Sequence, residues 1–102
     1  MLRITDLPET TSDGLSTRTL VVEGTLTGPW LMELRRAWQR VREAGVRDQI
    51  RVHLADVRFV DAAGKVLLAE MYRDGVDIVA RGSFGMGIRD EIIAACATDR
   101  AH

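Results

Sequence analysis

One abrupt change of hydrophobic period near the middle of the chain constrains the fold more than any other feature of the sequence. Residues 50–60 read IRVHLADVRFV, a run rich in β-branched and apolar residues that is typical of a central β-strand. Residues 61–68 read DAAGKVLL and begin a helical pattern without an intervening loop. Because strand–helix–strand connections join parallel strands through a right-handed crossover, this stretch predicts an α/β fold.

Further strands and helices alternate along the rest of the chain. The first helix shows the clearest amphipathic stripe, formed by Leu31, Leu34, Trp38 and Val41. Alternating or β-branched residues indicate the strands, and glycine or proline residues delimit the helices. We therefore expect strands over 2–7, 19–23, 50–60 and 76–80, helices over 30–44, 61–74 and 88–97, and loops over 8–14 and 81–87.

This order of elements predicts one layered domain that spans residues 1–102. A mixed four-stranded β-sheet, with its first strand antiparallel, would pack against about three α-helices. The length suits a single hydrophobic core, and 46% hydrophobic with 28% charged residues is typical of a soluble globular protein.

Charge and hydropathy exclude several classes of partner. The chain carries 14 basic and 15 acidic residues, a net charge of −1, so no overall field attracts nucleic acid or an anionic membrane. The opening sequence MLRITDL lacks the apolar core of a signal peptide, and no run reaches the ~18 apolar residues of a membrane span. We therefore expect a cytoplasmic protein that binds no nucleic acid and does not insert into a membrane.

The residues that carry most enzymatic chemistry are scarce. Cys96 is the single cysteine, which rules out an internal disulfide, and we expect a small packed or partly exposed thiol. His53 and His102 are the only histidines, so metal-ligand spacing is absent. No pairing of a nucleophile with a base can be assembled. The expectation is a non-enzymatic protein without a cofactor or a metal.

The turn between the central strand and the second helix has a clear structural role. Asp61 occupies an N-cap position, where its carboxylate can accept hydrogen bonds from the amides at 63 and 64. Gly64 allows close approach by backbone or by a partner, or is simply tolerated in the first turn. Ala62 and Ala63 carry no reactive group, so the turn is suited to being recognised and not to reacting.

Three segments, in their order along the chain, resemble the sulfate-transporter and anti-sigma-factor-antagonist (STAS) domain family. They read LVVEGTLTGPWLMELRRAW, IRVHLADVRFVDAAGKVLLAEMY and DIVA, and the resemblance covers about residues 18–80. The corner GTL at 24–26 and the turn DAAG at 61–64 match the family's motifs. The resemblance implies the STAS fold and a regulatory role through binding another protein.

This chain departs from the family at the position that governs regulation. In family members that act as anti-sigma factor antagonists, a partner kinase phosphorylates a serine directly after the aspartate of the turn. Here that residue is Ala62, and the alternative hydroxyl position is Ala63, so no phosphorylation is expected at the turn. The resemblance then implies an anti-sigma factor or serine kinase as the partner of a protein that phosphorylation of the turn cannot release.

The second helix is apolar nearly all round, which one face of a small sheet cannot bury completely. We expect the surplus to face a protein partner or a second copy of the chain, with Trp30 as an aromatic anchor at the start of the first helix. The lone lysine, Lys65, belongs to the same surface. The predicted partner-binding residues are Thr27, Trp30, Asp61, Ala62, Ala63, Gly64, Lys65 and Leu68.

Two other functions stay open on the sequence alone. Some stand-alone relatives of the family dock on a transporter or its ATPase, and this chain would fit such a role. Alternatively, the helix start at 61–64 and the glycine-rich loop at 82–87 would bind a nucleotide or another small ligand. That loop matches neither the dinucleotide fingerprint nor the P-loop.

His53 is the histidine nearest to the turn in sequence. On the central strand it faces opposite to Val52 and Leu54, and it is expected to be half-buried and hydrogen-bonded to its surroundings. A second hypothesis pairs its imidazolium with the carboxylate of Asp61, which would form a pH-sensitive corner.

Overall fold

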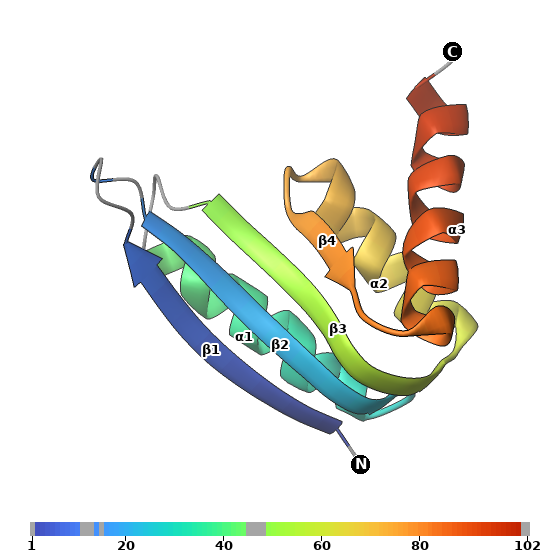
Figure 1. The fold of residues 1–102 in the computed structure, drawn as a ribbon, viewed down its shortest axis with the longest axis horizontal. Helices are drawn as coiled ribbons and strands as arrows, with labels where there is room; N and C mark the ends of the chain where they lie inside the picture. The colour runs from blue at the N-terminus through green and yellow to red at the C-terminus, as the bar shows by residue number, and fades with distance from the viewer. Residues whose placement is uncertain (1, 11–13, 15, 45–48, 101–102) are drawn as a thin grey trace.

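Seven strands and helices form over the residues that the computed structural model describes, which are 2–10, 14, 16–44 and 49–100 (Figure 1). In chain order they are β1 (Leu2–Thr10), β2 (Ser16–Leu26), α1 (Trp30–Ala44), β3 (Gln49–Val60), α2 (Ala62–Arg73), β4 (Asp77–Ala80) and α3 (Ser83–Arg100). The sheet has the order β1-β2-β3-β4, with β1 antiparallel to β2 and the other three strands parallel. The predicted mixed four-stranded sheet with three helices is confirmed.

The antiparallel hairpin is longer than the sequence indicated. β1 continues through Pro8 to Thr10, which pairs with Ser16, where a loop over 8–14 was expected. That part of the prediction was wrong for residues 8–10, because proline is tolerated on an edge strand whose outer side has no strand to bond. The extension lies at the end of the sheet opposite to the starts of the helices.

Two β-bulges bend β3 and decide which of its side chains are buried. The pairing with β2 skips Ala55 and Arg58, so each adds one residue to β3 alone. Each bulge reverses the alternation of side chains, so Val57 and Val60 are buried while Phe59 is 54% exposed. An aromatic side chain therefore stands on the surface at the carboxyl end of β3.

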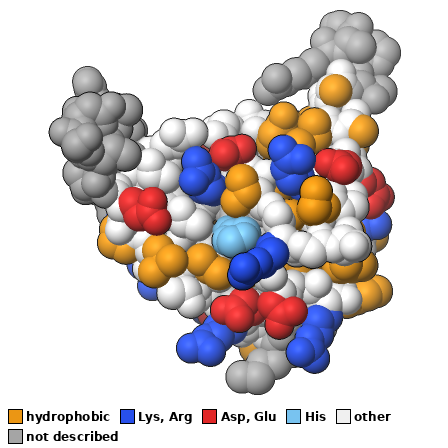
Figure 2. Space-filling view, viewed as in Figure 1, with side chains coloured by type: hydrophobic (Ala, Val, Ile, Leu, Met, Phe, Trp, Pro, Cys, Tyr) orange, Lys and Arg blue, Asp and Glu red, His pale blue; other side chains and the backbone are white. Residues whose placement is uncertain are grey.

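The helices cover one face of the sheet. In Figure 1, α1 lies behind β1, β2 and β3, while α2 and α3 pack at the side of β4; the opposite face is the one seen in Figure 2. One core joins Leu20, Val22, Val52, Leu54 and Ile78 of the sheet to Leu34, Trp38 and Val41 of α1, Leu67, Leu68 and Met71 of α2, and Ile88, Ile92 and Cys96 of α3. The Cys96 thiol is thus packed in the core.

The contact between α2 and α3 removes most of the apolar surface that the sequence led us to expect on α2. Leu67, Leu68 and Met71 are buried, with at most 2% of their surface exposed. The prediction that surplus apolar residues of α2 are exposed was wrong for these three residues, because α3 covers α2 on a second side. Val66, which is 58% exposed, is the large hydrophobic residue of α2 that reaches the surface.

α3 begins earlier than the sequence indicated. Residues 81–87, RGSFGMG, were expected to form a loop, but the helix starts at Ser83. A Cβ on Gly85 would lie 3.3 Å from the Leu54 carbonyl oxygen and 3.4 Å from Ala80 Cβ, so glycine lets the helix pack closely on the sheet. The glycine-rich loop that a nucleotide-binding function would have used is therefore largely helical.

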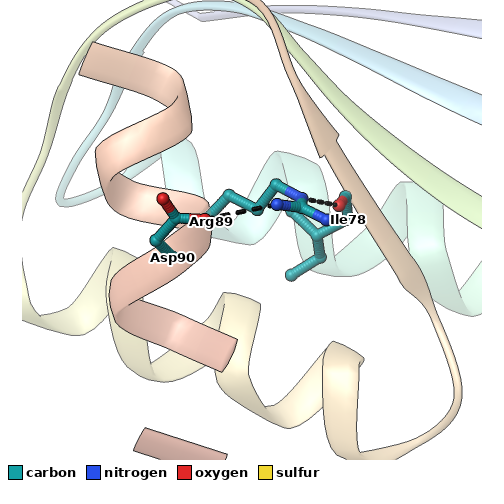
Figure 3. Close-up of polar contacts among 3 residues, drawn as sticks. All are labelled: Ile78, Arg89 and Asp90. Carbon is teal, nitrogen blue, oxygen red and sulfur yellow. Dashed lines mark hydrogen bonds and ion pairs between the residues drawn. The ribbon is translucent and has the colours of Figure 1, made fainter. Parts of the chain in front are cut away.

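A side-chain contact also fastens α3 to β4. Arg89 Nε donates a hydrogen bond to the Ile78 carbonyl oxygen at 2.9 Å, and its Nη1 lies 3.2 Å from Oδ1 of Asp90 (Figure 3). β4 is an edge strand, and unpaired carbonyl groups on an edge favour pairing with another chain. The guanidinium of Arg89 therefore satisfies part of an edge that would otherwise face solvent.

Candidate functional site

Asp61 ties the starts of two helices together. Its backbone is extended (φ −81°, ψ 178°) between β3 and α2, and its Oδ1 accepts a hydrogen bond from Gly64 N at 2.7 Å. This bond confirms the predicted N-cap, an interaction worth about 1 kcal/mol. The second oxygen, Oδ2, accepts from Gly28 N at 3.2 Å, in the corner that precedes α1. One carboxylate thereby joins the turn before α2 to the corner before α1.

The corner before α1 is built from backbone hydrogen bonds. Trp30 N donates to the Thr27 carbonyl oxygen at 3.0 Å and so begins the helix. Asp61 N donates to the Leu26 carbonyl oxygen at 3.3 Å, which joins corner and turn through the main chain as well. Gly28 has φ +49°, a left-handed conformation that glycine adopts without steric cost. Thr27 is half-buried in this corner, and Trp30 is exposed.

Gly64 is required by the close approach of this corner. A Cβ at Gly64 would lie 2.6 Å from the Leu26 carbonyl oxygen, 2.8 Å from Val60 Cγ1 and 3.2 Å from Asp61 Oδ1. The first of these contacts is with backbone, so it cannot be relieved by rotating a side chain. Of the roles that the sequence left open for Gly64, close approach by backbone is therefore the one observed. Gly64 is itself buried.

The outward side of the turn consists of two methyl groups and one cation. Ala62 and Ala63 are exposed, and Lys65 Nζ lies 3.2 Å from Oε1 of Glu91 on α3. Leu68, which the sequence analysis placed on the same surface, is fully buried. That assignment is corrected: Leu68 supports α2 from the core, because α3 and the sheet enclose its side of the helix.

Exposed large hydrophobic side chains lie at this same end of the molecule. α1, α2 and α3 all begin at the carboxyl end of the parallel strands, toward the lower edge of Figure 1. Seven such side chains are exposed in the described part of the chain, and all but Leu7 lie within the first five residues of a helix or next to the last residue of β3. We call this set the apolar end: Trp30, Met32, Phe59, Val66, Phe84 and Met86.

Sequence reasoning had not placed most of the apolar end on the surface. Phe59 was assigned to a central strand, and the bulges that turn it outward leave no signal in a single sequence. Phe84 and Met86 fell in the segment that was expected to be a loop. Met32 lies off the apolar stripe of α1, so its exposure was detectable from helical periodicity.

His53 alternates along β3 with the buried Val52 and Leu54, so it lies on the face of the sheet away from the helices, and its predicted pairing with Asp61 is wrong. His53 pairs in register with Val21 and Val79, and β3 runs on to Val60. The remaining strand separates the two residues by roughly 20 Å, and both carboxylate oxygens of Asp61 accept from backbone amides.

Two further features bear on the kind of site. Within the described ranges, no group of three or more histidine, cysteine, aspartate or glutamate side chains is placed to hold a metal ion. None of the described helices combines the length and the apolar character needed to cross a membrane. What the candidate site does contain is a backbone held by the hydrogen bonds of Asp61 and surrounded by exposed apolar side chains.

The mixed four-stranded sheet with three helices, in this order along the chain, is the STAS fold of anti-sigma factor antagonists. The crystal structure of an anti-sigma factor antagonist from Mycobacterium paratuberculosis shares this fold with a TM-score of 0.63. The two sequences are 22% identical, and the similarity covers 97% of this chain and 82% of that chain. No family model matches the sequence, and no curated protein matches it significantly. The resemblance seen in the sequence motifs is confirmed for the fold.

Proposed function

We propose that this protein is a non-enzymatic regulatory module that binds another protein, in the manner of an anti-sigma factor antagonist, through the start of α2 and the apolar end. The observation that carries the proposal is the location of the exposed hydrophobic side chains around a turn that Asp61 and Gly64 hold rigid. A rigid surface loses little conformational entropy on binding. The fold shared with an antagonist supports a role of the same kind.

The proposal includes a surface that phosphorylation of the turn does not switch. Ala62 and Ala63 are exposed but carry methyl groups, to which no phosphoryl group can be transferred. A phosphoserine in their place would add a charge of about −1.5 to −2 to an apolar surface. The turn of this chain therefore keeps its uncharged, apolar surface at all times. The partner that fits is a cytoplasmic protein such as an anti-sigma factor.

Two matched substitutions test the proposed surface. Affinity purification from the native host with mass spectrometry identifies the partner, and calorimetric titration then gives its dissociation constant. Val66→Asp places a charge within the apolar end and should weaken binding about ten-fold or more. Leu7→Asp alters the exposed hydrophobic residue that lies on β1, away from that end, and should leave the affinity unchanged.

Melting temperatures of the two variants are compared first, so that a loss of binding is not a loss of folding. Both side chains are exposed, so neither substitution should unfold the protein. Binding that survives Val66→Asp, or that falls equally with Leu7→Asp, would show that the partner docks elsewhere.

A further inference from the structure

The two edges of the sheet differ in how far they are protected against a further strand. β4 has four residues, and Arg89 Nε donates a hydrogen bond to the Ile78 carbonyl oxygen at 2.9 Å. β1 has nine residues, and β2 is its single neighbour in the sheet. Because the main-chain groups on the outer side of an edge strand can bond another strand, β1 is the edge at which a second chain would be added.

Pro8 limits the part of β1 that can pair with a further strand. Proline has no N–H to donate and is found essentially only on edge strands, so a strand that is paired on both sides would end before Pro8. The remaining part runs from Leu2 to Leu7, and its centre lies between Ile4 and Thr5. Antiparallel pairing of β1 with its own copy would therefore place a two-fold axis near these two residues.

A hollow lies beside this part of β1, between the strand and α1. It has a volume of about 160 Å³ and is lined by Ile4, Asp6, Leu20, Glu33, Ala37 and Arg40. Ile4 and Leu20 give the hollow an apolar floor, and Ala37 is a small residue that leaves room for another chain to approach closely. The carboxylate of Asp6 is compensated within the chain, since its Oδ1 lies 3.6 Å from Arg18 Nε.

The side chains that line the hollow from α1 lie on the flank of that helix away from α2. Arg35 marks the opposite flank, where its Nη2 lies 3.1 Å from Glu70 Oε2 of α2. Glu33 and Arg40 are exposed, and within the described part of the chain neither side chain forms an ion pair. A two-fold axis beside Ala37 would set Glu33 of each copy against Arg40 of the other.

The spacing of strands and helices allows both contacts to form at once. α1 packs on β1 and β2 together (Figure 1). If β1 pairs with its copy, the midpoints of the two β1–β2 pairs are two strand spacings apart, which is about 10 Å. Packed helices lie roughly 8–10 Å apart. A sheet that continues through β1 would therefore bring α1 against its copy in antiparallel orientation, with Ala37 near the centre of the contact.

We propose that β1 and the adjoining flank of α1 form the interface of a symmetric homodimer, in which two sheets join edge to edge through antiparallel pairing of residues 2–7. Glu33 of each copy pairs with Arg40 of the other. This reciprocity favours a second copy over a strand of another protein, because the two opposite charges lie on either side of the small residue next to the axis.

The proposed interface lies at the edge of the sheet opposite to α2 and α3. The inference therefore goes beyond the proposed function and does not depend on it. It leaves the start of α2 free, so a dimer would present that surface twice.

Charge reversal tests the reciprocal contact. Glu33→Arg sets arginine against arginine across the axis, and Arg40→Glu sets glutamate against glutamate, so each should weaken the dimer about ten-fold or more in sedimentation experiments. An equimolar mixture of the two variants should form a dimer with one chain of each, because the arginines of one then meet the glutamates of the other. Glu43→Arg makes the same change at an exposed position of α1 that does not line the hollow, and should leave the dimer intact.

Amide hydrogen exchange tests the pairing of the strands. At equal protein concentration, the outward-facing amides within residues 2–7 should exchange about ten-fold more slowly in the wild type than in Glu33→Arg. Melting temperatures at a concentration where all the proteins are monomeric should match, because the substituted side chains are exposed.

Three results would overturn the proposal. One is a wild type that stays monomeric at every concentration, which would leave the edge of β1 to a strand of another protein. Another is a dimer that survives either charge reversal, or a mixture of the two variants that stays monomeric. The third is equal exchange over residues 2–7 in the wild type and in Glu33→Arg, which would show that β1 does not pair with its copy.

Discussion

α2 and α3 begin at the same end of the sheet, but different interactions hold them there. The start of α2 depends on one side chain, since Asp61 accepts from both Gly64 N and Gly28 N. At the start of α3, Met86 N donates to the Gly82 carbonyl oxygen at 3.0 Å, and Gly85 lies close against the Leu54 carbonyl group. One helix start is specified by a local cap, and the other by packing on the sheet.

This difference between a capped and a packed helix start divides the apolar end into two parts. Around α2 the backbone is held by the cap and by the contact of Gly64 with the corner, and the turn itself exposes the methyl groups of Ala62 and Ala63. Around α3 the exposed groups are Phe84 and Met86, which lie between glycines. Methionine is flexible and adapts to irregular surfaces. We therefore expect the α2 side to set the register of a partner and the α3 side to adapt to it.

Replacement of one glycine by alanine in α2 and of one in α3 should show most strongly how differently the starts of the two helices are held. In Gly64→Ala the new Cβ would lie 2.6 Å from the Leu26 carbonyl oxygen, so the free energy of unfolding should fall by about 2–3 kcal/mol. In Gly87→Ala it meets nothing within 4 Å, and helix propensity should raise the free energy of unfolding by about 0.5–1 kcal/mol. Urea unfolding monitored by tryptophan fluorescence measures both. A Gly64→Ala variant as stable as the wild type would mean that the corner and the turn are not in contact.

Removal of the cap should have a smaller effect. Asp61→Ala loses the bonds to Gly64 N and Gly28 N, and the free energy of unfolding should fall by about 1–2 kcal/mol. Asp61→Asn keeps one oxygen acceptor and should lose roughly half as much. Amide hydrogen exchange at Gly28 should accelerate in the alanine variant. Unchanged exchange there would show that Asp61 caps α2 alone and does not link the two helix starts.

The start of α2 was predictable because its signals are local. Asp61 and Gly64 lie within one turn, and their side-chain chemistry defines a cap without reference to the rest of the fold. The start of α3 was not predictable, because Gly82, Gly85 and Gly87 disfavour a helix by propensity. The contact that favours the helix there, between Gly85 and the backbone of β3, exists only once the sheet has formed.

The distinction between local signals and tertiary contacts also explains the other wrong predictions at the candidate site. Leu68 was placed on the surface because a helix on a sheet has an outer side, and only the packing of α3 encloses it. Phe59 reaches the surface through a bulge at Arg58, which depends on pairing with β2. His53 was expected near Asp61 because it was placed close to the exit of the central strand, whereas β3 continues beyond it to Val60. The residue types of the turn were predictable, whereas the surroundings of the turn depended on tertiary contacts.

The affinity of the partner for an Ala62→Glu variant tests most directly the claim that the start of α2 is the recognition surface. An acid in the first turn of a helix is favourable to the helix dipole, so the variant should melt at the wild-type temperature. Ala62→Ser is the uncharged control and should bind like the wild type. We expect Ala62→Glu to bind about ten-fold more weakly, or worse, because its charge would be buried against the partner without a counter-ion. Wild-type affinity in the folded Ala62→Glu variant would contradict this account.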